Sequence, residues 1–277
     1  KRQYNGINMK RIVVKIGTNV ITRNDGSLDI TQMSSLVDQI SELHKNRFEV
    51  IMVSSGSVAC GRSLLPGITE NLDTLDQRQL FSAVGQAKLI DLYYTLFKEH
   101  NIAIGQVLTT KESLSGKKQM ENQYNCMSVM IKHRIIPIIN ENDTIAITEL
   151  MFTDNDELAG LVAQMMEAGC LVLLTNVDGI YKLTKGQDAV SADLSNAEII
   201  REVHPNDDIE KFITKKKSAR GRGGMITKES VAIKAAKSGI EAFIANGRKN
   251  GIITDLMNNP QKTVSTRFIP VLESVQP

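Results

Sequence analysis

The chain contains no tryptophan and only three cysteines among its 277 residues. Cys60, Cys126 and Cys170 do not have the close spacing of zinc ligands, and an odd number of cysteines disfavours a complete disulfide framework. We therefore expect reduced thiols and a cytoplasmic location, because disulfides are rare in that compartment.

Long apolar runs and a marked excess of one charge are also missing. No run approaches the ~20 residues that a membrane-spanning helix needs, and the basic start is followed by polar residues rather than by the apolar segment of a signal peptide. The formal net charge is +2, so the charge balance favours neither a nucleic-acid nor a membrane partner. Residues 1–8 are interpreted as a leader or tag, expected to be disordered.

Three common sequence motifs are absent as well. No segment fits the P-loop pattern G-x-x-x-x-G-K-[ST], and no G-x-G-x-x-G follows a predicted strand. The G-x-S-x-G pattern is missing around Ser55, and the four histidines lie in polar helical or loop contexts. Ordinary P-loop, Rossmann and Ser-His hydrolase interpretations are therefore disfavoured.

The chain does contain continuous apolar runs that alternate with stretches of helical periodicity. Strands are predicted at 11–16, 50–53, 102–108, 135–139, 171–174 and 241–245. Helices are predicted from Ile30 onward with Asp29 as N-cap, and at about 75–100, 120–133, 156–168 and 224–238. This alternation predicts an α/β fold, a three-layer α/β/α sandwich with a mainly parallel central sheet. We expect a single domain over 9–277, with the polar segment 182–222 contributing surface loops.

Two clusters of acidic and amide residues stand beside these elements. Residues 140–143 (Asn-Glu-Asn-Asp) follow the predicted strand 135–139, and residues 153–156 (Thr-Asp-Asn-Asp) open the next helix. Ligands in open α/β sheets lie beyond the carboxyl ends of the strands, so both clusters are well placed for a small charged ligand. The clusters alone leave a metal, a sugar or an amino acid open.

Lys15 and four glycine-containing turns indicate a site for phosphate. Lys15 lies near the end of a predicted buried strand, where an inward lysine needs a carboxylate, a phosphate or both as partners. The turns lie at 15–19, 54–57, 175–179 and 221–228, and glycine lets backbone N–H groups approach a phosphate closely. Residues 215–224 superficially resemble an RGG-type nucleic-acid segment, but they form a single run without aromatic residues in a nearly neutral chain.

Together these motifs resemble the amino acid kinase family over about residues 10–268. The ordered segments are 14–18, 53–57, 140–143, 154–156 and 223–228. The match is closest to the members that use ATP to phosphorylate the γ-carboxylate of L-glutamate in the first step of proline synthesis. It implies a substrate-binding lobe at about 9–170 and a nucleotide-binding lobe at about 171–277. It also implies a form without the C-terminal PUA domain of many bacterial relatives.

The resemblance implies roles for residues at the matching positions. Lys15 and Lys228 are expected to contact the ATP phosphates from opposite sides and Asp156 to orient both lysines, so these three form the catalytic set. Glutamate is expected to be bound by Ser55, Gly56, Asn140, Asp143 and Asn155. ATP is expected to be bound by Lys15, Gly17, Thr175, Asn176, Arg222, Gly223, Gly224, Met225, Ile226, Thr227 and Lys228.

The chemistry that the resemblance implies needs no general base, because a γ-carboxylate is already an anion at neutral pH. Two lysines and Mg²⁺ would neutralise the transferring phosphoryl group. Mg²⁺ is expected to be held largely by ATP phosphates and water, so no protein ligand is assigned to it. Asp143 is our choice for the substrate's α-ammonium group. Arg222 and Asn176 depart from the family's usual Thr and Asp, which affects the detail of nucleotide binding.

Several alternatives remain open at this point. The acceptor could be aspartate, acetylglutamate or a nucleoside monophosphate. The chain could instead be an inactive amino-acid-binding or RNA-binding regulator, which predicts loss of Lys15, Lys228 or Asp156, yet all three are present. The family further suggests proline as a feedback inhibitor and a homodimer or homotetramer.

Overall fold

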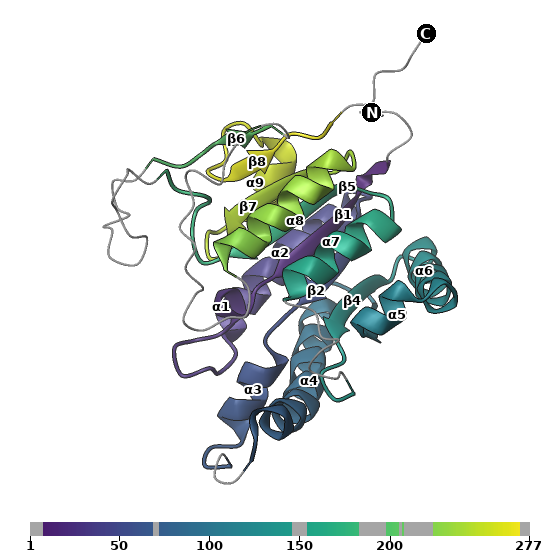
Figure 1. Cartoon of the computed structure of the whole chain (residues 1–277), viewed down its shortest axis with the longest axis vertical. Helices are drawn as coiled ribbons and strands as arrows, with labels where there is room; N and C mark the ends of the chain where they lie inside the picture. The colour runs from purple at the N-terminus through teal and green to yellow at the C-terminus, as the bar shows by residue number, and fades with distance from the viewer. Residues whose placement is uncertain are drawn as a thin grey trace.

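One eight-stranded sheet forms the centre of the molecule (Figure 1). The computed structural model describes residues 8–68, 72–145, 154–182, 198–204, 207 and 224–271. The strand order is β3-β4-β2-β1-β5-β7-β8-β6, and every neighbouring pair is parallel except β7 with β8. The strands are β1 (Asn8–Ile16), β2 (Glu49–Ser54), β3 (Ile104–Thr109), β4 (Ile136–Glu141), β5 (Ala168–Thr175), β6 (Glu202–Val203), β7 (Glu241–Asn246) and β8 (Thr266–Phe268).

Strand β1 lies in the interior of the sheet between β2 and β5. Ile12, Val13, Val14 and Ile16 are completely buried, which explains why this strand is apolar on both faces rather than alternating. Its partners continue the pattern, since Val14 lies opposite Met52 of β2 and Val172 of β5. Because β1 is an interior strand, its last residues, including Lys15, lie near the middle of the edge formed by the carboxyl ends of the strands.

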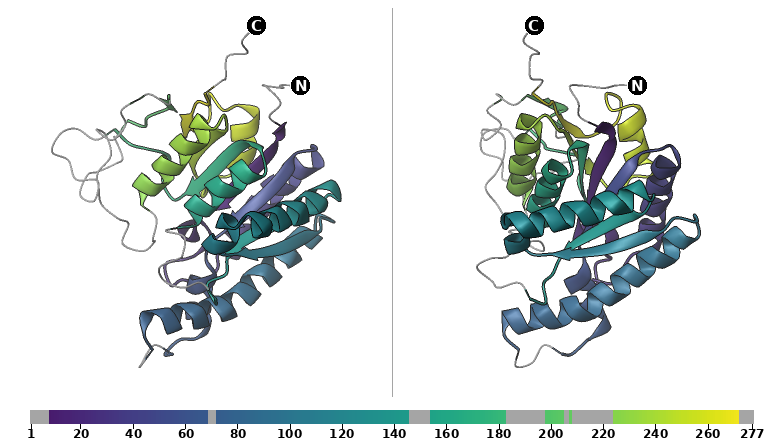
Figure 2. Two further views of the ribbon diagram at one scale, coloured as in Figure 1. Left: turned by 45° about the vertical axis from the view of Figure 1, so that its right-hand side comes forward. Right: turned by 90° about the vertical axis from the view of Figure 1, so that its right-hand side faces the viewer.

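Helices cover both faces of the sheet and complete three layers (Figure 2). One hydrophobic core joins one face to α2, α4 and α9, and a second core joins the opposite face to α6, α7 and α8. These covering helices are α2 (Ile30–Lys45), α4 (Thr74–Lys98), α6 (Lys117–Lys132), α7 (Asn155–Met165), α8 (Met225–Lys237) and α9 (Ile252–Asn258). The remaining described helices are α1 (Thr18–Ile21), α3 (Ser57–Leu64) and α5 (Lys111–Ser115).

Helices α3 and α4 pack with direct backbone contact below the sheet in Figure 1. A Cβ on Gly61 would lie 1.9 Å from the carbonyl oxygen of Phe81, and a Cβ on Gly85 would lie 1.8 Å from that of Ser57. Only glycine fits at either position. This contact brings the start of α3 close to one face of α4.

The predicted α/β/α sandwich with a mainly parallel sheet is confirmed. Each predicted strand and helix is present with ends shifted by a few residues, and Asp29 accepts the N-cap hydrogen bond from Gln32. The prediction omitted α1, α3, α5, α9 and β8. It also omitted β6, a two-residue strand inside the segment expected to contribute surface loops.

Some expectations concern parts of the chain outside the described residues. These include the leader up to residue 7 and most of the segments 182–222 and 215–224, although β1 already begins at Asn8. The expected boundary between the lobes, at residue 170, falls inside β5, which pairs with β1 on one side and with β7 on the other. Within the described ranges, no helix combines the length and apolarity needed to cross a bilayer.

Candidate active site

The residues of interest gather at the carboxyl ends of β1, β2 and β4 and at the start of α7. Because these strands are parallel, their carboxyl ends lie at one edge of the sheet. Lys15 comes from β1, Ser55 follows β2, Asn140 is the last residue but one of β4, and Asp156 lies in the first turn of α7. The structure thus brings both predicted acid-amide clusters to the predicted lysine.

Lys15 and Lys228 bind the same carboxylate from two directions. The Nζ atom of Lys15 lies 2.6 Å from Oδ1 of Asp156, and Nζ of Lys228 lies 2.7 Å from Oδ2. Asp156 is completely buried, while the two lysines are 4% and 8% exposed. The inward lysine of β1 therefore has the carboxylate partner that its position requires, and α8 contributes a second cation.

This arrangement strongly perturbs the charged groups. Burial by itself would raise the pKa of Asp156, but Lys15 and Lys228 hold it well below its usual value. Burial would likewise lower the pKa of Lys15, yet Asp156 and Asp154 raise it above its usual value. Asp156 and Lys15 therefore form a buried ion pair at neutral pH, because the pKa of the acid is lowered and that of the lysine is raised.

Asp154 adds a second carboxylate at the start of α7. It caps the helix by accepting a hydrogen bond from the backbone N–H of Asp156, and its Oδ1 lies 3.6 Å from Lys15 Nζ. Burial raises the pKa of Asp154 to about 6, with Lys15 opposing the shift. Its other oxygen, Oδ2, is buried and has no hydrogen-bond partner in the described part of the chain.

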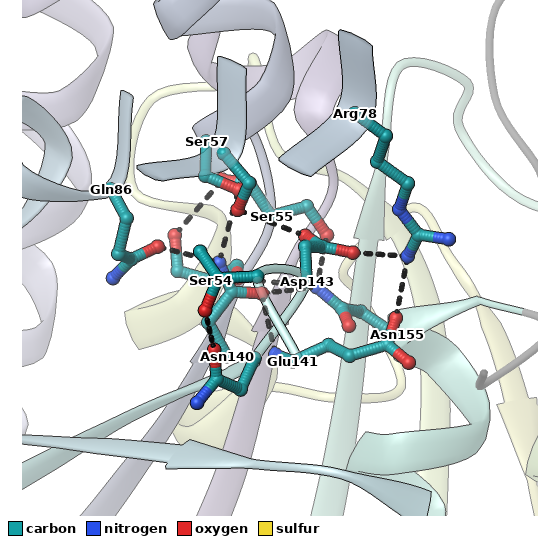
Figure 3. Close-up of polar contacts among 12 residues, drawn as sticks. Ser54, Ser55, Ser57, Arg78, Gln86, Asn140, Glu141, Asp143 and Asn155 are labelled. Carbon is teal, nitrogen blue, oxygen red and sulfur yellow. Dashed lines mark hydrogen bonds and ion pairs between the residues drawn. The ribbon is translucent and has the colours of Figure 1, made fainter. Parts of the chain in front are cut away.

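Asn155 connects this charged group to a cluster of neutral polar side chains (Figure 3). Its Nδ2 atom lies 2.8 Å from Oδ1 of Asn140, 3.0 Å from Oγ of Ser55 and 3.2 Å from the carbonyl oxygen of Ser54. Asn140 in turn donates to Gln86 of α4 at 2.8 Å and to Ser57 of α3 at 3.4 Å. The amides are thus held in defined orientations by strand ends and by two helices.

Asp143 lies on the turn after β4 and is bound by α4. Its Oδ1 forms an ion pair with Arg78, and its Oδ2 accepts a hydrogen bond from Ser82 at 3.2 Å. Arg78 also contacts Glu141, with 2.8 Å between Nη2 and Oε2. Burial raises the pKa of Asp143, and Arg78 opposes that shift. This carboxylate already has a protein cation beside it.

Two glycines shape the backbone next to these side chains. Gly56 has φ of 106° and forms the N-cap of α3, a conformation that favours glycine. A Cβ on Gly17 would lie 3.1 Å from the carbonyl oxygen of Leu174 and 3.8 Å from Lys15 Nζ. Both residues keep the backbone close to the strand ends, where a ligand would approach.

The predicted ATP residues are only partly within the described chain. Thr175 ends β5 and is followed by the exposed Asn176, and α8 begins at Met225 after Gly224. Thr227 and Lys228 lie in its first turn, with Ile226 exposed. Arg222 and Gly223 lie outside the described residues.

Some polar residues at this edge were not predicted from sequence. Arg78, Ser82 and Gln86 from α4 and Ser57 from α3 belong to the amide cluster. Asp178, which accepts from Asn246 and pairs with Lys249, links the ends of β5 and β7. The i, i+4, i+8 spacing on α4 was the available signal, but polar residues at that spacing usually mark a solvated helix face.

The described residues offer limited means of holding a metal by themselves. None of them form a group of three or more His, Cys, Asp or Glu side chains suited to a metal ion. The unpartnered Oδ2 of Asp154 is a single acceptor of the type that Mg²⁺ prefers. This donor set fits an ion bound mainly by a substrate rather than by a protein cage.

Comparison with known proteins agrees with this architecture. Residues 10–246 match the family model described as the amino acid kinase family. The chain therefore belongs to the amino acid kinase family.

Three curated relatives of the chain are glutamate 5-kinases. The chain is 55% identical over 265 residues to glutamate 5-kinase of Bacteroides thetaiotaomicron, covering 96% of this chain and 71% of that protein. It is 40% identical to glutamate 5-kinase of Chlorobaculum tepidum, with coverage of 94% and 69%. It is 37% identical to that of Clostridium acetobutylicum, with coverage of 95% and 96%.

Solved structures with the same fold are more distant in sequence. UMP kinase from Ureaplasma parvum has a TM-score of 0.59 at 18% identity, covering 95% of this chain and 99% of that one. Isopentenyl phosphate kinase from T. acidophilum has a TM-score of 0.63 at 16% identity, with coverage of 93% and 99%. These two comparisons establish the shared fold.

Proposed function

We propose that this chain uses ATP to phosphorylate the γ-carboxylate of L-glutamate, forming L-glutamyl 5-phosphate in the first step of proline biosynthesis. The 55% identity to a glutamate 5-kinase over 96% of the chain supports the substrate. The structural observation that carries the proposal is the adjacency of Asn155 and Asp156. Asn155 belongs to the polar cluster suited to an amino acid, and Asp156 holds the two lysines suited to phosphates.

The lysines provide the chemistry that this transfer needs. The γ-carboxylate is an anionic nucleophile, so catalysis consists mainly of bringing it to a polyanion and stabilising the charge on the transferring phosphoryl group. Lys15 and Lys228 supply two buried positive charges that Asp156 keeps in place before substrates bind. Fixed charges need little reorganisation during the reaction, which is why their prior placement matters.

The polar cluster matches the remaining groups of glutamate. Asp143 would accept the α-ammonium group, and Ser55, Gly56, Asn140 and Asn155 would supply hydroxyl, amide or backbone donors for its carboxylates. Neutral donors suit this task because they bind a carboxylate without pairing permanently with the neighbouring acids. Asn155 would exchange one of its present acceptors for the substrate.

ATP would lie along Lys15, Gly17, Thr175, Asn176 and the start of α8. The first backbone N–H groups of α8 follow Gly224, which has no capping side chain, and a helix N-terminus favours phosphate. Bound Mg²⁺ would supply further charge neutralisation at the phosphates. Asp154 would contact it or one of its waters through the unpartnered Oδ2.

An acceptor panel with MgATP tests the proposal directly. We expect ADP formation that depends on L-glutamate, together with an acyl phosphate that hydroxylamine converts into a hydroxamate. Aspartate, acetylglutamate and UMP serve as competing acceptors, since other kinases of this fold act on different substrates. Turnover that is independent of glutamate, or that occurs only with another acceptor, would contradict the proposal.

Regulation and assembly form a second part of the proposal. Proline would act as a feedback inhibitor, and the protein would be a cytoplasmic homodimer or homotetramer. An unchanged rate at millimolar proline would argue against the first, and a monomeric mass by light scattering at assay concentration would argue against the second.

A further inference from the structure

Three polar residues of α4 face the predicted amino-acid site at regular helical spacing. Arg78 and Ser82 contact Asp143, and Gln86 contacts Asn140. Residues four apart lie on the same side of a helix, so this series is one continuous polar stripe. Figure 3 shows Arg78 and Gln86 approaching the ends of β2 and β4 from this helix.

We propose that Arg78 is a positioning residue that holds Asp143 ready for the α-ammonium group of the substrate. The inference rests on the proposed function and adds a residue that governs recognition of the amino acid. Arg78 acts through Asp143, so it is not itself a catalytic residue.

Contacts from α4 engage both oxygens of Asp143. Arg78 pairs with Oδ1 and Ser82 donates to Oδ2, which restricts rotation of the carboxylate. Each carboxylate oxygen has about two acceptor sites, so either oxygen can still accept a hydrogen bond from an ammonium group. The carboxylate is therefore oriented by the protein and remains able to bind a cation.

Arg78 also balances the charge of this region. Glu141 and Asp143 are both buried, at 5% and 6% exposure, and the guanidinium contacts both. One cation between two carboxylates leaves a net charge of −1, which attracts an ammonium group. Removing Arg78 would take a cation away from both carboxylates, so the pKa of Asp143, which Arg78 holds down, would rise.

The planar guanidinium suits this position better than an ammonium group would. The same Nη2 atom contacts Glu141 and Asp143, and the guanidinium carries three further N–H donors on Nε and Nη1 in fixed directions. A lysine keeps the charge but cannot reproduce that fixed geometry. Arg78→Lys therefore changes the hydrogen-bond geometry while keeping the positive charge, whereas Arg78→Met removes both.

The test compares Arg78→Met, Arg78→Lys, Glu141→Gln and the double variant R78M/E141Q with the wild-type protein. Lys88→Met is the matched control, because Lys88 is also on α4 and its pair with Asp91 is exposed. KM for glutamate, KM for ATP and kcat are measured between about pH 6 and pH 9, where a raised carboxyl pKa becomes visible. Circular dichroism verifies that each variant is folded.

We expect Arg78→Met to raise KM for glutamate by ~10-fold or more, with KM for ATP changed by less than ~2-fold. Arg78 from α4 pairs with Asp143 and Ser82 donates to it, while Glu141 from β4 shares the Arg78 guanidinium. Removing Arg78 raises the pKa of Asp143 further, so KM for glutamate should fall as pH rises. Arg78→Lys should retain the wild-type pH profile with an intermediate KM.

The double variant separates charge balance from general damage. Removing Glu141 as well leaves one carboxylate, so R78M/E141Q should recover ~3-fold or more of the glutamate affinity lost in R78M. Equal increases in both KM values, a pH-independent KM for glutamate in R78M, or no recovery in the double variant would overturn the inference. If R78M does not fold, Arg78→Lys decides: an intermediate KM for glutamate with the wild-type pH profile supports the inference, and a wild-type KM overturns it.

The wild-type protein distinguishes the two proposals. Absence of glutamate turnover in the wild type would overturn the proposed function and this inference together. Normal wild-type turnover, combined with variants that match Lys88→Met, would overturn this inference alone.

Discussion

Lys15 and Lys228 bind opposite oxygens of one buried carboxylate, Asp156. One lysine comes from the central strand of the sheet and the other from α8, so a single side chain of α7 fixes the relative position of both. Two buried ammonium groups would repel each other without it. The relative position of the two ammonium groups proposed to act on the phosphoryl group therefore depends on Asp156 more than on either lysine alone.

Replacing Asp156 should therefore damage both catalysis and stability. Asp156→Asn keeps the shape but leaves two cations facing a neutral amide, so we expect kcat to fall by ~10²-fold or more. The free energy of unfolding should fall by about 3 kcal/mol, because a buried ion pair loses one partner. Steady-state kinetics and urea denaturation measure the two effects.

The matched control for Asp156→Asn is Glu157→Gln, one residue further along α7. Its pair with Lys111 is 3.1 Å long and about one third exposed, so we expect a stability change below ~1 kcal/mol. Equal effects of the two substitutions would contradict the role of Asp156.

Lys228 should act mainly on the transition state. Lys228→Ala removes a positive charge expected beside the transferring phosphoryl group, so kcat should fall by ~10²-fold or more with KM for glutamate changed by less than ~3-fold. Lys234→Ala on the exposed side of the same helix is the control and should leave both constants unchanged. A large increase in KM for glutamate with normal kcat would place Lys228 in the amino-acid site instead.

Asp154 should make stability depend on pH in a specific direction. Its pKa is about 6 in the folded protein against an ordinary value of 3.8, so the folded state binds more protons between those values. Its contribution to the free energy of unfolding therefore decreases as pH rises through this window. Asp154→Asn retains an N-cap acceptor and removes that penalty.

Urea denaturation of both proteins at several pH values measures this effect. The variant should gain on the order of 1–3 kcal/mol over the wild type above about pH 7, and this gain should disappear near about pH 4. The pKa of Asp156 is lowered, which makes stability fall in acid, but Asp156 is present in both proteins and largely cancels in the difference. A difference that is constant with pH would contradict the prediction.

The contact between α3 and α4 should tolerate no side chain at Gly85. A Cβ there would lie 1.8 Å from the carbonyl oxygen of Ser57 and 2.5 Å from the backbone nitrogen of Gly61. Since backbone must move, Gly85→Ala should destabilise the protein by about 1–3 kcal/mol or more. It should also raise KM for glutamate, because Ser57 and Gln86 contact Asn140.

Gly116→Ala provides the control for Gly85→Ala. Its Cβ would meet only the flexible end of Gln119 closely, so thermal denaturation should show a small change and KM for glutamate none. Similar losses from both substitutions would mean that the α3–α4 contact has no special role.

The sequence predicted the parts of the fold that depend on local patterns. Buried parallel strands such as β1 and β5 are continuous apolar runs, which can be recognised in the sequence. An inward Lys15 needs a carboxylate or a phosphate as its partner, so this requirement could also be predicted. The structure supplies Asp156 and Asp154. Strands β6 and β8 have only two and three residues, so they are too short for an apolar run or an alternating pattern to be recognised in the sequence.

The omitted site residues depend on contacts between distant segments. Arg78 lies 63 residues before Glu141, and Gln86 lies 54 residues before Asn140. In sequence both look like ordinary polar positions of a long helix. Their partners become evident only after β4 and α4 are placed side by side, which no local periodicity determines.

The interior position of β1 also has a consequence for how the protein folds. Strand β1 pairs with β5, which lies more than a hundred residues later in the chain, and pairings between such distant strands form slowly because a long loop must close first. Lys15, Asp156 and Lys228 come from β1, α7 and α8, so they meet only when that pairing and its covering helices are complete. Recovery of activity after dilution from urea should therefore follow the slowest refolding phase rather than the early return of helix.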